Sequence, residues 1–401
     1  MSDARRHALV IGAGLAGAAA CSALARRGWR ITLLDAAGGP ASGASGLPVG
    51  MLSPHVTRSP TPLSRLSALG VADTLAELRR LVPEGSGWQA CEVDNLAHDP
   101  GRWPAALVRP SALVQAWLNE ATGLDALTCL WNAHVHRLSL DMSRDPSCPA
   151  VWQAWDAEGH PLANAPVVIV AAALGSLSLL AGDSGQLSGG DLPLRPVQGQ
   201  MSLAALEGPV LAERPQRSDG VFVPRYQDSG LPPLWPDTIW TMGSTYERGL
   251  THTDVSLEAH ERNARSLHAI QPAAADRLRS TLARGRLLGW AQVRCASLDR
   301  LPLVGAAPDT AALRDLMASG RGQRVRVQLA DVPRWPGLHL LSAMGSRGLT
   351  LAHWCAEQLA MQLAGEATWG EQSLQEALDP ARFALKNARR QGVAQERATA
   401  G

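Results

Sequence analysis

The chain has 401 residues, of which 46% are hydrophobic and 18% are charged, and its formal net charge at pH 7 is +1. This composition is that of an ordinary globular protein, and the length favours one large domain or two closely joined ones. A net charge so near zero excludes recruitment of nucleic acid or an anionic membrane by a global positive field, so any such partner requires a local patch.

The cysteines argue against metal binding and cross-linking. They are scattered without a C-x-x-C pair, at positions 21, 91, 129, 148, 295 and 355, so neither a metal site nor a disulfide framework is indicated. Reduced thiols of this kind are typical of the cytoplasm, which we expect as the location. No uninterrupted run of about 18 apolar residues occurs, so no membrane span is expected.

A strand, a glycine-rich turn, a helix and a second strand are predicted first. HALVI at 7–11 is an apolar run, the segment 12–28 carries small residues at helical spacing, and WRITLLD at 29–35 is a second apolar run. Between strand and helix, Gly12, Gly14 and Gly17 form the pattern G-x-G-x-x-G. There the first glycine permits the turn, the second lets a pyrophosphate approach, and the third lets the helix pack on the sheet.

This turn predicts an adenine dinucleotide site. Amides at the start of the helix, including those of Leu15 and Ala16, offer hydrogen-bond donors and a positive dipole end to the phosphates. Asp35 ends the second strand at the offset of roughly 20 residues where an acid binds the ribose hydroxyls. FAD and NAD share this pattern. Its N-terminal position, and a later strand VVIVAAALG that closes at Gly175, favour FAD.

The remaining elements alternate between strand and helix patterns. A long loop rich in Gly, Ser and Pro at 36–54 has the length of a functional loop. Helices are predicted at 61–81 and 109–123 and strand-like runs at 127–140, 151–159 and 165–176. From 192 to 290 strand signals mix with one long polar helix over 256–286, and a strand running into a helix at 337–365 precedes a frayed polar tail.

The chain resembles the FAD-dependent D-amino-acid-oxidase superfamily, which includes glycine and sarcosine oxidases. The resemblance lies in the order of seven short motifs: VIGAGLAG, LLD, GASG, VVIVAAALG, PVQGQ, LDRLPLVG and GSRGL. Within the superfamily, four motifs are most similar to the oxidoreductase half of the MnmC family, bacterial enzymes that modify the tRNA wobble uridine. They are GASG at 43–46, PVQGQ at 196–200, VRCASLDRLPLVG at 293–305 and AMGSRGLTLAHWCAEQLA at 343–360. The resemblance covers essentially the whole chain.

The resemblance implies an α/β (α+β) fold. A Rossmann-like FAD-binding domain of the D-amino-acid/glycine-oxidase type would carry an inserted antiparallel-sheet substrate domain. We expect residues 1–85, 107–195 and 296–385 to form the FAD-binding domain, residues 86–106 and 196–295 to form the substrate domain, and residues 386–401 to form a flexible tail.

The resemblance also implies an activity. That branch removes the carboxymethyl group from 5-carboxymethylaminomethyl-(2-thio)uridine 34 of tRNA, which leaves the aminomethyl form and glyoxylate. A methyltransferase domain usually precedes the flavin domain. Because the glycine pattern begins at residue 12, we expect that domain to be absent and a separate methyltransferase to act downstream. Leu47, Pro48 and Gln198 depart from the family pattern and bear on the substrate more than on the cofactor.

Further cofactor residues follow from the same resemblance. GSRGLT begins a helix whose amides would face the flavin pyrimidine ring, where negative charge accumulates on reduction; glycines that serve only a tight turn are the alternative. For Arg347, contact with a phosphate, contact with RNA and simple solvation stay open. Gly199 inside a strand marks either close approach of the isoalloxazine or a bulge. The expected contacts are Ser42, Ser45, Gly46, Gly175, Gly305, Gly345, Ser346, Arg347, Gly348 and Leu349.

The expected catalytic residues are Arg294, Tyr246 and Gln200. Arg294 stands where the superfamily places the arginine that grips the substrate carboxylate as a fork, and a structural ion pair is the alternative. Tyr246 and Tyr226, the only tyrosines, are either covers for the substrate or half-buried core aromatics. Cys295 is expected to be an inert buried thiol rather than a redox or flavin-linking group.

The substrate stays open at this point. The arginine-rich segment 262–290 with Arg65, Arg79 and Arg80 is either a patch that follows RNA phosphates or a set of solvated helices. The tryptophans either stack bases or fill the core. A tRNA oxidase is the leading hypothesis. A small-molecule amine oxidase acting on glycine, sarcosine or another amino acid is the second, and a flavin-bearing RNA-binding or scaffold protein without turnover is the third. The sequence identifies neither the electron acceptor nor the oligomeric state.

Overall fold

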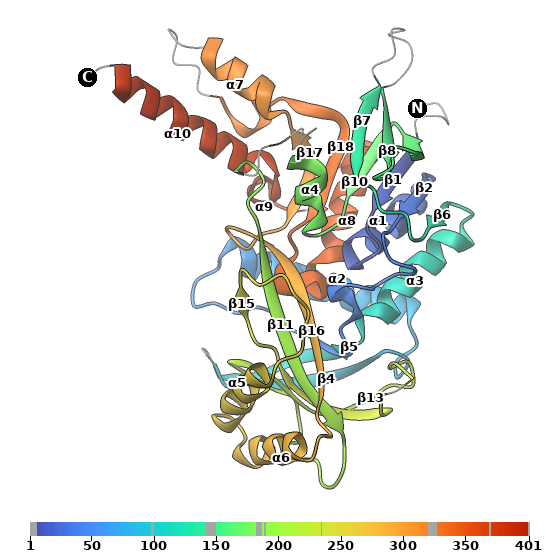
Figure 1. The fold of residues 1–401 in the computed structure, drawn as a ribbon, viewed down its shortest axis with the longest axis vertical. Coiled ribbons are helices and arrows are strands. Elements are labelled where there is room, and N and C mark those ends of the chain that lie inside the picture. Colours follow the sequence, from blue (N-terminus) through green and yellow to red (C-terminus); the bar gives the residue numbers. More distant parts are fainter. Residues whose placement is uncertain are drawn as a thin grey trace.

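The structure is a computed structural model that describes residues 6–97, 100–141, 150–181, 187, 190–233, 235–319, 327–368 and 370–399. Its strands form three sheets (Figure 1). The mixed α/β class predicted from the sequence is confirmed, and the first and second sheets carry the residues predicted to bind cofactor and substrate.

The first sheet has the order β17-β18-β10-β1-β2-β6. All its pairs are parallel except β17 with β18. Continuous Val, Ile and Leu runs such as VVIV form its central strands because both faces of a parallel sheet are covered. The strands are β1 (His7–Ile11), β2 (Arg30–Leu34), β6 (Leu127–Leu130), β10 (Val167–Val170), β17 (Leu303–Pro308) and β18 (Arg334–Ser342).

Helices cover one face of this sheet and a small sheet covers the other. Ala8 and Val10 of β1 point into a core shared with α1 (Leu15–Ala25), α2 (Pro62–Leu81), α3 (Pro110–Gly123) and α8 (Gly348–Ala364). Leu9 and Ile11 point to the opposite side. That side holds β7 (Arg137–Asp141), β8 (Val151–Trp155), β9 (Pro161–Ala165) and α4 (Gly175–Ala181). The alternation along β1 therefore divides the core in two.

The second sheet has the order β15-β11-β14-β13-β12-β4-β5-β3, with β16 paired to β11, and all its pairs are antiparallel except β12 with β4. Figure 1 shows β11 and β16 side by side, and their register runs from Leu194 opposite Ser297 to Leu203 opposite Leu288. The strands are β3 (Gly50–Leu52), β4 (Trp88–Asn95), β5 (Gly101–Val108), β11 (Leu194–Ala205), β12 (Gln216–Ser218), β13 (Gly220–Gln227), β14 (Thr238–Gly243), β15 (Glu247–Arg248) and β16 (Leu288–Ser297).

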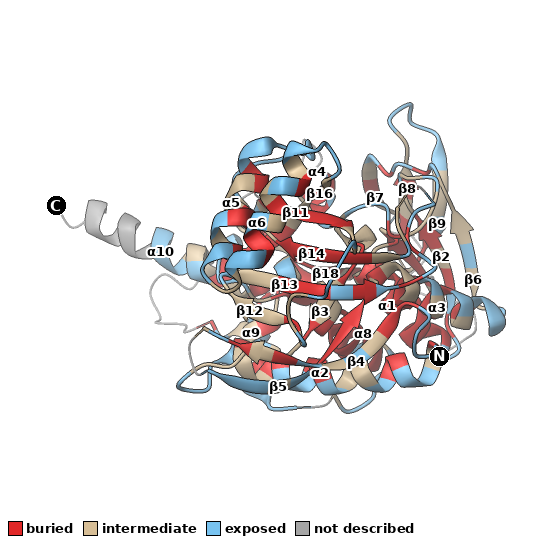
Figure 2. Cartoon of the chain, turned by 90° about the horizontal axis from the view of Figure 1, so that it is seen from below, coloured by how far each residue is buried: buried red, intermediate tan, exposed pale blue. Residues whose placement is uncertain are grey.

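The chain passes from the second sheet to the first between β16 and β17, and an isolated bridge between Ala296 and Met344 ties the end of β16 to the segment before α8. Figure 2 shows buried strands β11, β13 and β14 lying beneath α5 and α6. The predicted domain limits stay a prediction, and β3 joins the second sheet although it lies within 1–85.

Two sequence predictions differ from the structure at the helices. The prediction of a single helix over 256–286 was wrong. The segment forms two helices, because α5 (Leu257–His268) ends before Pro272, which begins α6 (Pro272–Ala283). Proline lacks the N–H that an uninterrupted helix would need there. The chain also forms α7 (Thr310–Ser319) and α9 (Gln372–Leu378), and α10 (Ala381–Thr399) continues as a helix where a frayed tail was expected.

Among the described residues no helix is both long and apolar enough to cross a membrane. The cysteines of this part of the chain are free thiols, and Cys148 lies outside the described residues. Burial raises the pKa of the Cys295 thiol to about 11, which fits the predicted inert, buried side chain.

A buried ionic cluster joins α2, α3 and α8, which cover one face of the first sheet. The Nδ1 atom of His353 lies 2.7 Å from a carboxylate oxygen of Asp73, and its Nε2 atom lies 3.2 Å from Glu77. The ring of Trp117 stacks on the imidazole with 5.5 Å between centroids and donates its Nε1–H to Glu77. Because His353 is almost fully buried, these contacts hold α8 against α2 and α3.

We expect this cluster to make stability depend on pH. Burial alone lowers the pKa of His353, but its hydrogen bonds to Asp73 and Glu77 outweigh burial and raise it from 6.5 to about 9. The raised pKa therefore contributes stability that is fully present below pH 6.5 and is lost as pH rises through 9, by on the order of 3 kcal/mol. Urea unfolding of the wild type and His353→Gln from pH 6 to 10 should show a difference that shrinks over this window.

Candidate functional site

The turn between β1 and α1 has the close packing that the glycine pattern requires. Gly12 has a φ of +107°, and a Cβ there would lie 2.6 Å from the carbonyl oxygen of Ala171. A Cβ on Gly17 would lie 1.8 Å from the carbonyl oxygen of Gly12. Both contacts are with backbone, so neither position accepts a side chain without movement of α1. Next to Gly14, the Ser45 hydroxyl lies 3.0 Å from where a Cβ would stand.

Side chains from two loops gather at the start of α1. The Asp35 carboxylate accepts hydrogen bonds from the amides of Ala13 at 2.6 Å and Ala37 at 2.8 Å. The Ser45 hydroxyl accepts one from the amide of Leu15 at 3.0 Å. The predicted residues Asp35 and Ser45 are thus brought to the positive dipole end of α1, and the Leu15 amide predicted for a dinucleotide phosphate is bonded to Ser45.

The loop that carries Ser45 lies beside the start of α8. It contains the short helix η2 (Ala44–Gly46), and a Cβ on Gly46 would lie 2.7 Å from the carbonyl oxygen of Ala41. Ser42 is exposed and donates to Gly39 within the loop. Leu47, one of the departures from the family pattern, lies with Leu349 against Gly50. Pro48 is buried, so both departures belong to the packing of this loop.

The two helix N-termini meet at this place. The short helix η4 (Gly345–Arg347) leads into α8, and a Cβ on Gly348 would lie 3.3 Å from the Leu15 side chain. Gly345 has a φ of +58° and faces Ala296 at the end of β16. The start of α8 has no side-chain cap, so its amides are available. Ser346 is exposed, whereas Arg347, Gly348 and Leu349 are half-buried.

Two predicted cofactor residues lie in other surroundings. Gly175 is exposed at the first turn of α4, and its amide donates to Ala172. Gly305 is buried in β17 with a φ of +124°, and the closest atoms to a Cβ there belong to Pro380 and Gln362. Their assignment to the cofactor stays a prediction.

Arg294 lies near the end of β16, and its guanidinium crosses Gly199 of β11. A Cβ on Gly199 would lie 1.3 Å from the Nη2 atom of Arg294. That Nη2 donates to the Ser244 hydroxyl at 2.9 Å and to the Thr245 carbonyl at 3.1 Å. The described group that approaches Gly199 most closely is therefore this guanidinium, and the approach of a flavin ring stays a prediction.

The charge of Arg294 has no counter-ion among the described residues. No Asp or Glu of this part of the chain comes within ion-pair distance, so the structural ion pair offered as an alternative is not formed. The guanidinium carbon lies 5.8 Å from the ring centre of Tyr246, an exposed side chain. Burial lowers the pKa of Arg294, while Tyr246 opposes that shift. An arginine held in this way is prepared to receive a carboxylate.

Gln200 and Tyr226 are not brought to this site. Along β11 alternate residues face opposite sides, so Gly199 faces Arg294 while Gln200 faces α5. Both ends of the Gln200 amide bond the backbone of Ser256, which precedes α5. Gln198 reaches the Asp254 carbonyl on the same side, so this departure lies away from Arg294. Tyr226 is buried and donates to Asp228, and it is the core aromatic of the two tyrosines.

Three of the six arginines in the arginine-rich segment 262–290 form ion pairs with described residues. Arg262 pairs with Glu247 and Glu258, and Arg279 pairs with Glu261 and Asp276. Arg286 pairs with Glu207, and Arg65 pairs with Glu371. Arg80 pairs with both Glu77 and Glu120. These contacts favour solvated helices over a phosphate-binding patch, because neighbouring carboxylates repel an anion.

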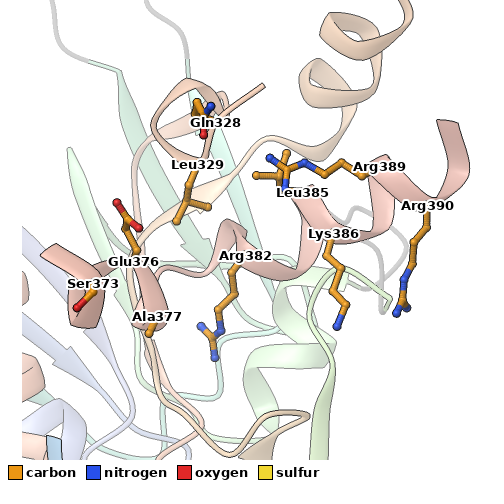
Figure 3. A pocket seen from close by; sticks show the side chains of 10 residues that line it. All are labelled: Gln328, Leu329, Ser373, Glu376, Ala377, Arg382, Leu385, Lys386, Arg389 and Arg390. Atoms are coloured by element: carbon orange, nitrogen blue, oxygen red, sulfur yellow. The ribbon is translucent and has the colours of Figure 1, made fainter. Parts of the chain in front are cut away.

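A surface groove of about 820 Å³ lies elsewhere, between η3 (Leu329–Asp331), α9 and α10. In Figure 3, Leu385 and Arg389 point toward Gln328 and Leu329, whereas Lys386 and Arg390 project from the other side of α10. The groove contains none of the residues predicted for cofactor or catalysis. The convergence of α1, α8 and β16 is therefore the better candidate for the active site.

Known proteins resemble this chain in sequence over most of its length. Residues 7–106 and 101–362 match the family described as "DAO: FAD dependent oxidoreductase". The chain is 36% identical, over 94% of its length, to the "tRNA 5-methylaminomethyl-2-thiouridine biosynthesis bifunctional protein MnmC" of Verminephrobacter eiseniae, of which it covers 63%. The chain is also 35% identical to the protein of the same name from a Polaromonas species. This match covers 93% of the present chain and 59% of the Polaromonas protein. The chain thus spans about three fifths of these relatives.

Solved structures share the fold at low sequence identity. Glycine oxidase from Geobacillus kaustophilus superposes with a TM-score of 0.65 and 17% identity, over 94% of this chain and 99% of that one. Fructosyl amine:oxygen oxidoreductase from Aspergillus fumigatus gives a TM-score of 0.64 and 16% identity, over 96% and 92% of the two chains. At such identities the likeness concerns the fold alone.

Proposed function

Since the chain belongs to the DAO family of FAD-dependent oxidoreductases, we propose that it oxidises the C–N bond of a glycine-like secondary amine. The proposed substrate is 5-carboxymethylaminomethyl-(2-thio)uridine 34 of tRNA, which loses its carboxymethyl group to leave the aminomethyl form and glyoxylate. The identity to tRNA-modifying relatives over 93–94% of the chain supports this substrate. A tRNA substrate also places the reaction in the cytoplasm.

FAD is the cofactor of this family, and the residues at the start of α1 fit it. Gly12 and Gly17 hold the turn closed by backbone packing, while a Cβ on Gly14 would meet only the Ser45 side chain. A pyrophosphate can therefore approach at Gly14, where helix amides lie, with Asp35 on the neighbouring strand end. The uncapped start of α8 lies against Leu15 and supplies further donors. Bound FAD supplies the acceptor for the hydride of the substrate.

The observation that carries the proposal is the Arg294 guanidinium without a counter-ion. A glycine-like arm offers a carboxylate as its handle, and an arginine fork fixes both the position and the direction of that group. Ser244 and Thr245 hold one end of the fork, so the other nitrogens stay available. We assign to Tyr246 the role of covering the bound carboxylate, because its ring lies 5.8 Å from the guanidinium carbon and is exposed.

The proposed reaction needs orientation more than acid–base groups. The substrate amine must be neutral, so that two electrons and a proton leave the glycine α-carbon as hydride and the amine loses its proton to water. A C=N bond forms between the former amine and that carbon. Water then adds and the C–N bond breaks, which releases glyoxylate and leaves the aminomethyl group on the uridine. Arg294 holds the carboxylate through both stages.

Replacing Gly199 by Ala is expected to weaken carboxylate binding without direct contact with the substrate. The new methyl group would overlap the Nη2 atom of Arg294 and lie 2.9 Å from the Thr245 carbonyl, so the guanidinium must move. We expect KM for the amine substrate to rise roughly tenfold, as for loss of one charge-assisted hydrogen bond. Steady-state kinetics would measure this. Gly123→Ala, where nothing lies within 4 Å of the new Cβ, is the matched control and should leave KM unchanged.

A small-molecule amine oxidase acting on glycine or sarcosine is the alternative. The near-zero net charge and the ion pairs of Arg262 and Arg279 favour it, since they weaken a general attraction for RNA. The two substrates differ in what surrounds the carboxylate. Purified holoenzyme that oxidises glycine or sarcosine with a higher kcat/KM than the modified tRNA would decide for the alternative.

Analysis of tRNA nucleosides tests the proposal in cells. A strain that lacks the gene should accumulate the carboxymethylaminomethyl form of uridine 34, and the gene carried on a plasmid should reverse this. Mass spectrometry of digested tRNA reads both forms. An unchanged nucleoside profile contradicts the proposed substrate.

A further inference from the structure

Three arginines near Arg294 lack a carboxylate partner in the described part of the chain. Arg217 of β12 donates to the Asn95 side chain, the Ser53 hydroxyl and the Pro54 carbonyl, all of them neutral groups. Arg300 is exposed in the turn after β16, and Arg347 is half-buried at the start of α8. No Asp or Glu of the described residues lies within ion-pair distance of any of them, in contrast to Arg262 and Arg279 on α5 and α6.

The segments that carry these arginines meet at one place. The Arg217 guanidinium contacts Ser53 and Pro54, which directly precede His55. The His55 amide donates to Ser67 of α2 at 2.9 Å. Further along α2, the hydroxyl of Thr74 donates to the Leu349 carbonyl at 3.1 Å, so α2 lies against the start of α8 and hence near Arg347. The bridge between Ala296 and Met344 brings the end of β16, which leads to Arg300, to the same segment.

Electrostatic coupling agrees with this placement. Burial lowers the pKa of His55, and Arg347, Arg217 and Arg300 lower it further. Burial also lowers the pKa of Arg347, Arg300 and Arg217 add to that shift, and Tyr246 opposes it. Since Tyr246 also lies next to Arg294, the group formed by Arg217, Arg300, Arg347 and His55 borders the carboxylate site. We call this group the arginine cluster.

Like charges gathered without a counter-ion repel one another, and a bound anion removes that repulsion. The carboxylate of a glycine-like arm is already assigned to Arg294, so the arginine cluster is suited to a second anion on the same substrate. Free glycine or sarcosine has only one carboxylate, whereas a nucleotide in RNA carries phosphodiesters on both sides of its ribose. Arginine forks match phosphate oxygens as well as they match carboxylates.

We propose that Arg217, Arg300 and Arg347, together with His55, bind a backbone phosphate of tRNA next to the wobble nucleotide while Arg294 holds the carboxymethyl group. The inference rests on the proposed function and extends it, because it explains how one site selects RNA over a free amino acid. The cluster acts by positioning the nucleotide and takes no part in the oxidation.

The dependence of tRNA binding on salt tests this directly and does not require turnover. Arg300→Gln is the variant of choice, because Arg300 is exposed and has no ion pair in the described part of the chain. Binding of tRNA to FAD-loaded protein is measured from about 50 to 200 mM salt. The slope of log Kd against log salt concentration should fall by about 1, as expected for one lost phosphate contact.

A matched control keeps the effect specific. Arg265 is an exposed arginine on α5, so Arg265→Gln removes the same charge from a different surface. Its slope should equal that of the wild type. An equal loss of slope in both variants would overturn the site, since it would mean that positive charge acts wherever it stands. An unchanged slope in Arg300→Gln would overturn it as well.

Two further measurements separate the possible failures. The ratio of kcat/KM for modified tRNA to kcat/KM for the free carboxymethylaminomethyluridine nucleoside should fall roughly tenfold in Arg300→Gln. If the wild type oxidises neither substrate, the proposed function fails while the salt slope still decides on phosphate binding. If Arg217→Gln or Arg300→Gln instead loses FAD and keeps the salt slope, the cluster serves the cofactor phosphates and the inference is refuted.

Discussion

Replacing Arg294 by Gln should lower kcat/KM for the carboxylate-bearing substrate on the order of 100-fold, mainly through KM. The substitution leaves the substrate carboxylate in a partly desolvated site without its cation and without the second arm of the fork. The kcat/KM of Arg294→Lys should lie between the values of the wild type and of Arg294→Gln, because lysine keeps the charge but places it on a single nitrogen. Steady-state kinetics with tRNA or the free nucleoside would measure both variants.

Arg248 offers a matched control for this experiment. Its guanidinium carbon also lies 5.8 Å from the ring centre of Tyr246, but the residue is exposed at the end of β15. Arg248→Gln therefore removes a second arginine from the same aromatic ring without touching Gly199 or Ser244, and we expect less than a threefold change. Equal effects in the two variants would remove the carboxylate-binding role from Arg294.

The Gly17→Ala variant should lose FAD and a large part of its stability. Its Cβ would stand 1.8 Å from the Gly12 carbonyl oxygen, an atom of a turn that is itself packed against Ala171. Since neither backbone segment can yield locally, α1 must shift away from the sheet, at a cost of roughly 3 kcal/mol. The shift also moves the amides that would face the pyrophosphate.

Flavin absorbance of the purified protein and thermal unfolding would report the two effects separately. Gly39→Ala is a suitable control, because nothing lies within 4 Å of a Cβ there and the residue belongs to the same predicted cofactor region. A Gly17→Ala protein that retains full flavin content and an unchanged Tm would contradict the role given to this turn.

The parts of the molecule that could be read from the sequence are those fixed by local chemistry. The turn with Gly12, Gly14 and Gly17 lies between two apolar runs, and each glycine has a steric reason that acts within a few residues or on the adjacent strand. Where a local signal was overlooked, the prediction failed. Pro272 divides the segment 256–286 into α5 and α6, although the helical periodicity continues on both sides.

The orientation of side chains around Arg294 required the pairing of distant strands. The PVQGQ run by itself does not say which of its residues face the site. The antiparallel register of β11 with β16 brings Gly199 beneath the Arg294 guanidinium, and the period of two along the strand then turns Gln200 toward Ser256. Local sequence carries no information about that register.

The electrostatic properties of the protein also divide into a part that follows from the sequence and a part that follows from the tertiary structure. The sequence determined that the chain has 37 basic and 36 acidic groups, and hence that no global field attracts RNA. Only the tertiary structure decided which of these charges neutralise one another, because ion pairing depends on distances between segments far apart in the chain. Among the described residues Arg262 of α5 and Arg279 of α6 found carboxylates, whereas Arg294 and the arginine cluster did not. The positive charge available to a substrate was therefore set by folding, at the place where β16, α2 and α8 meet.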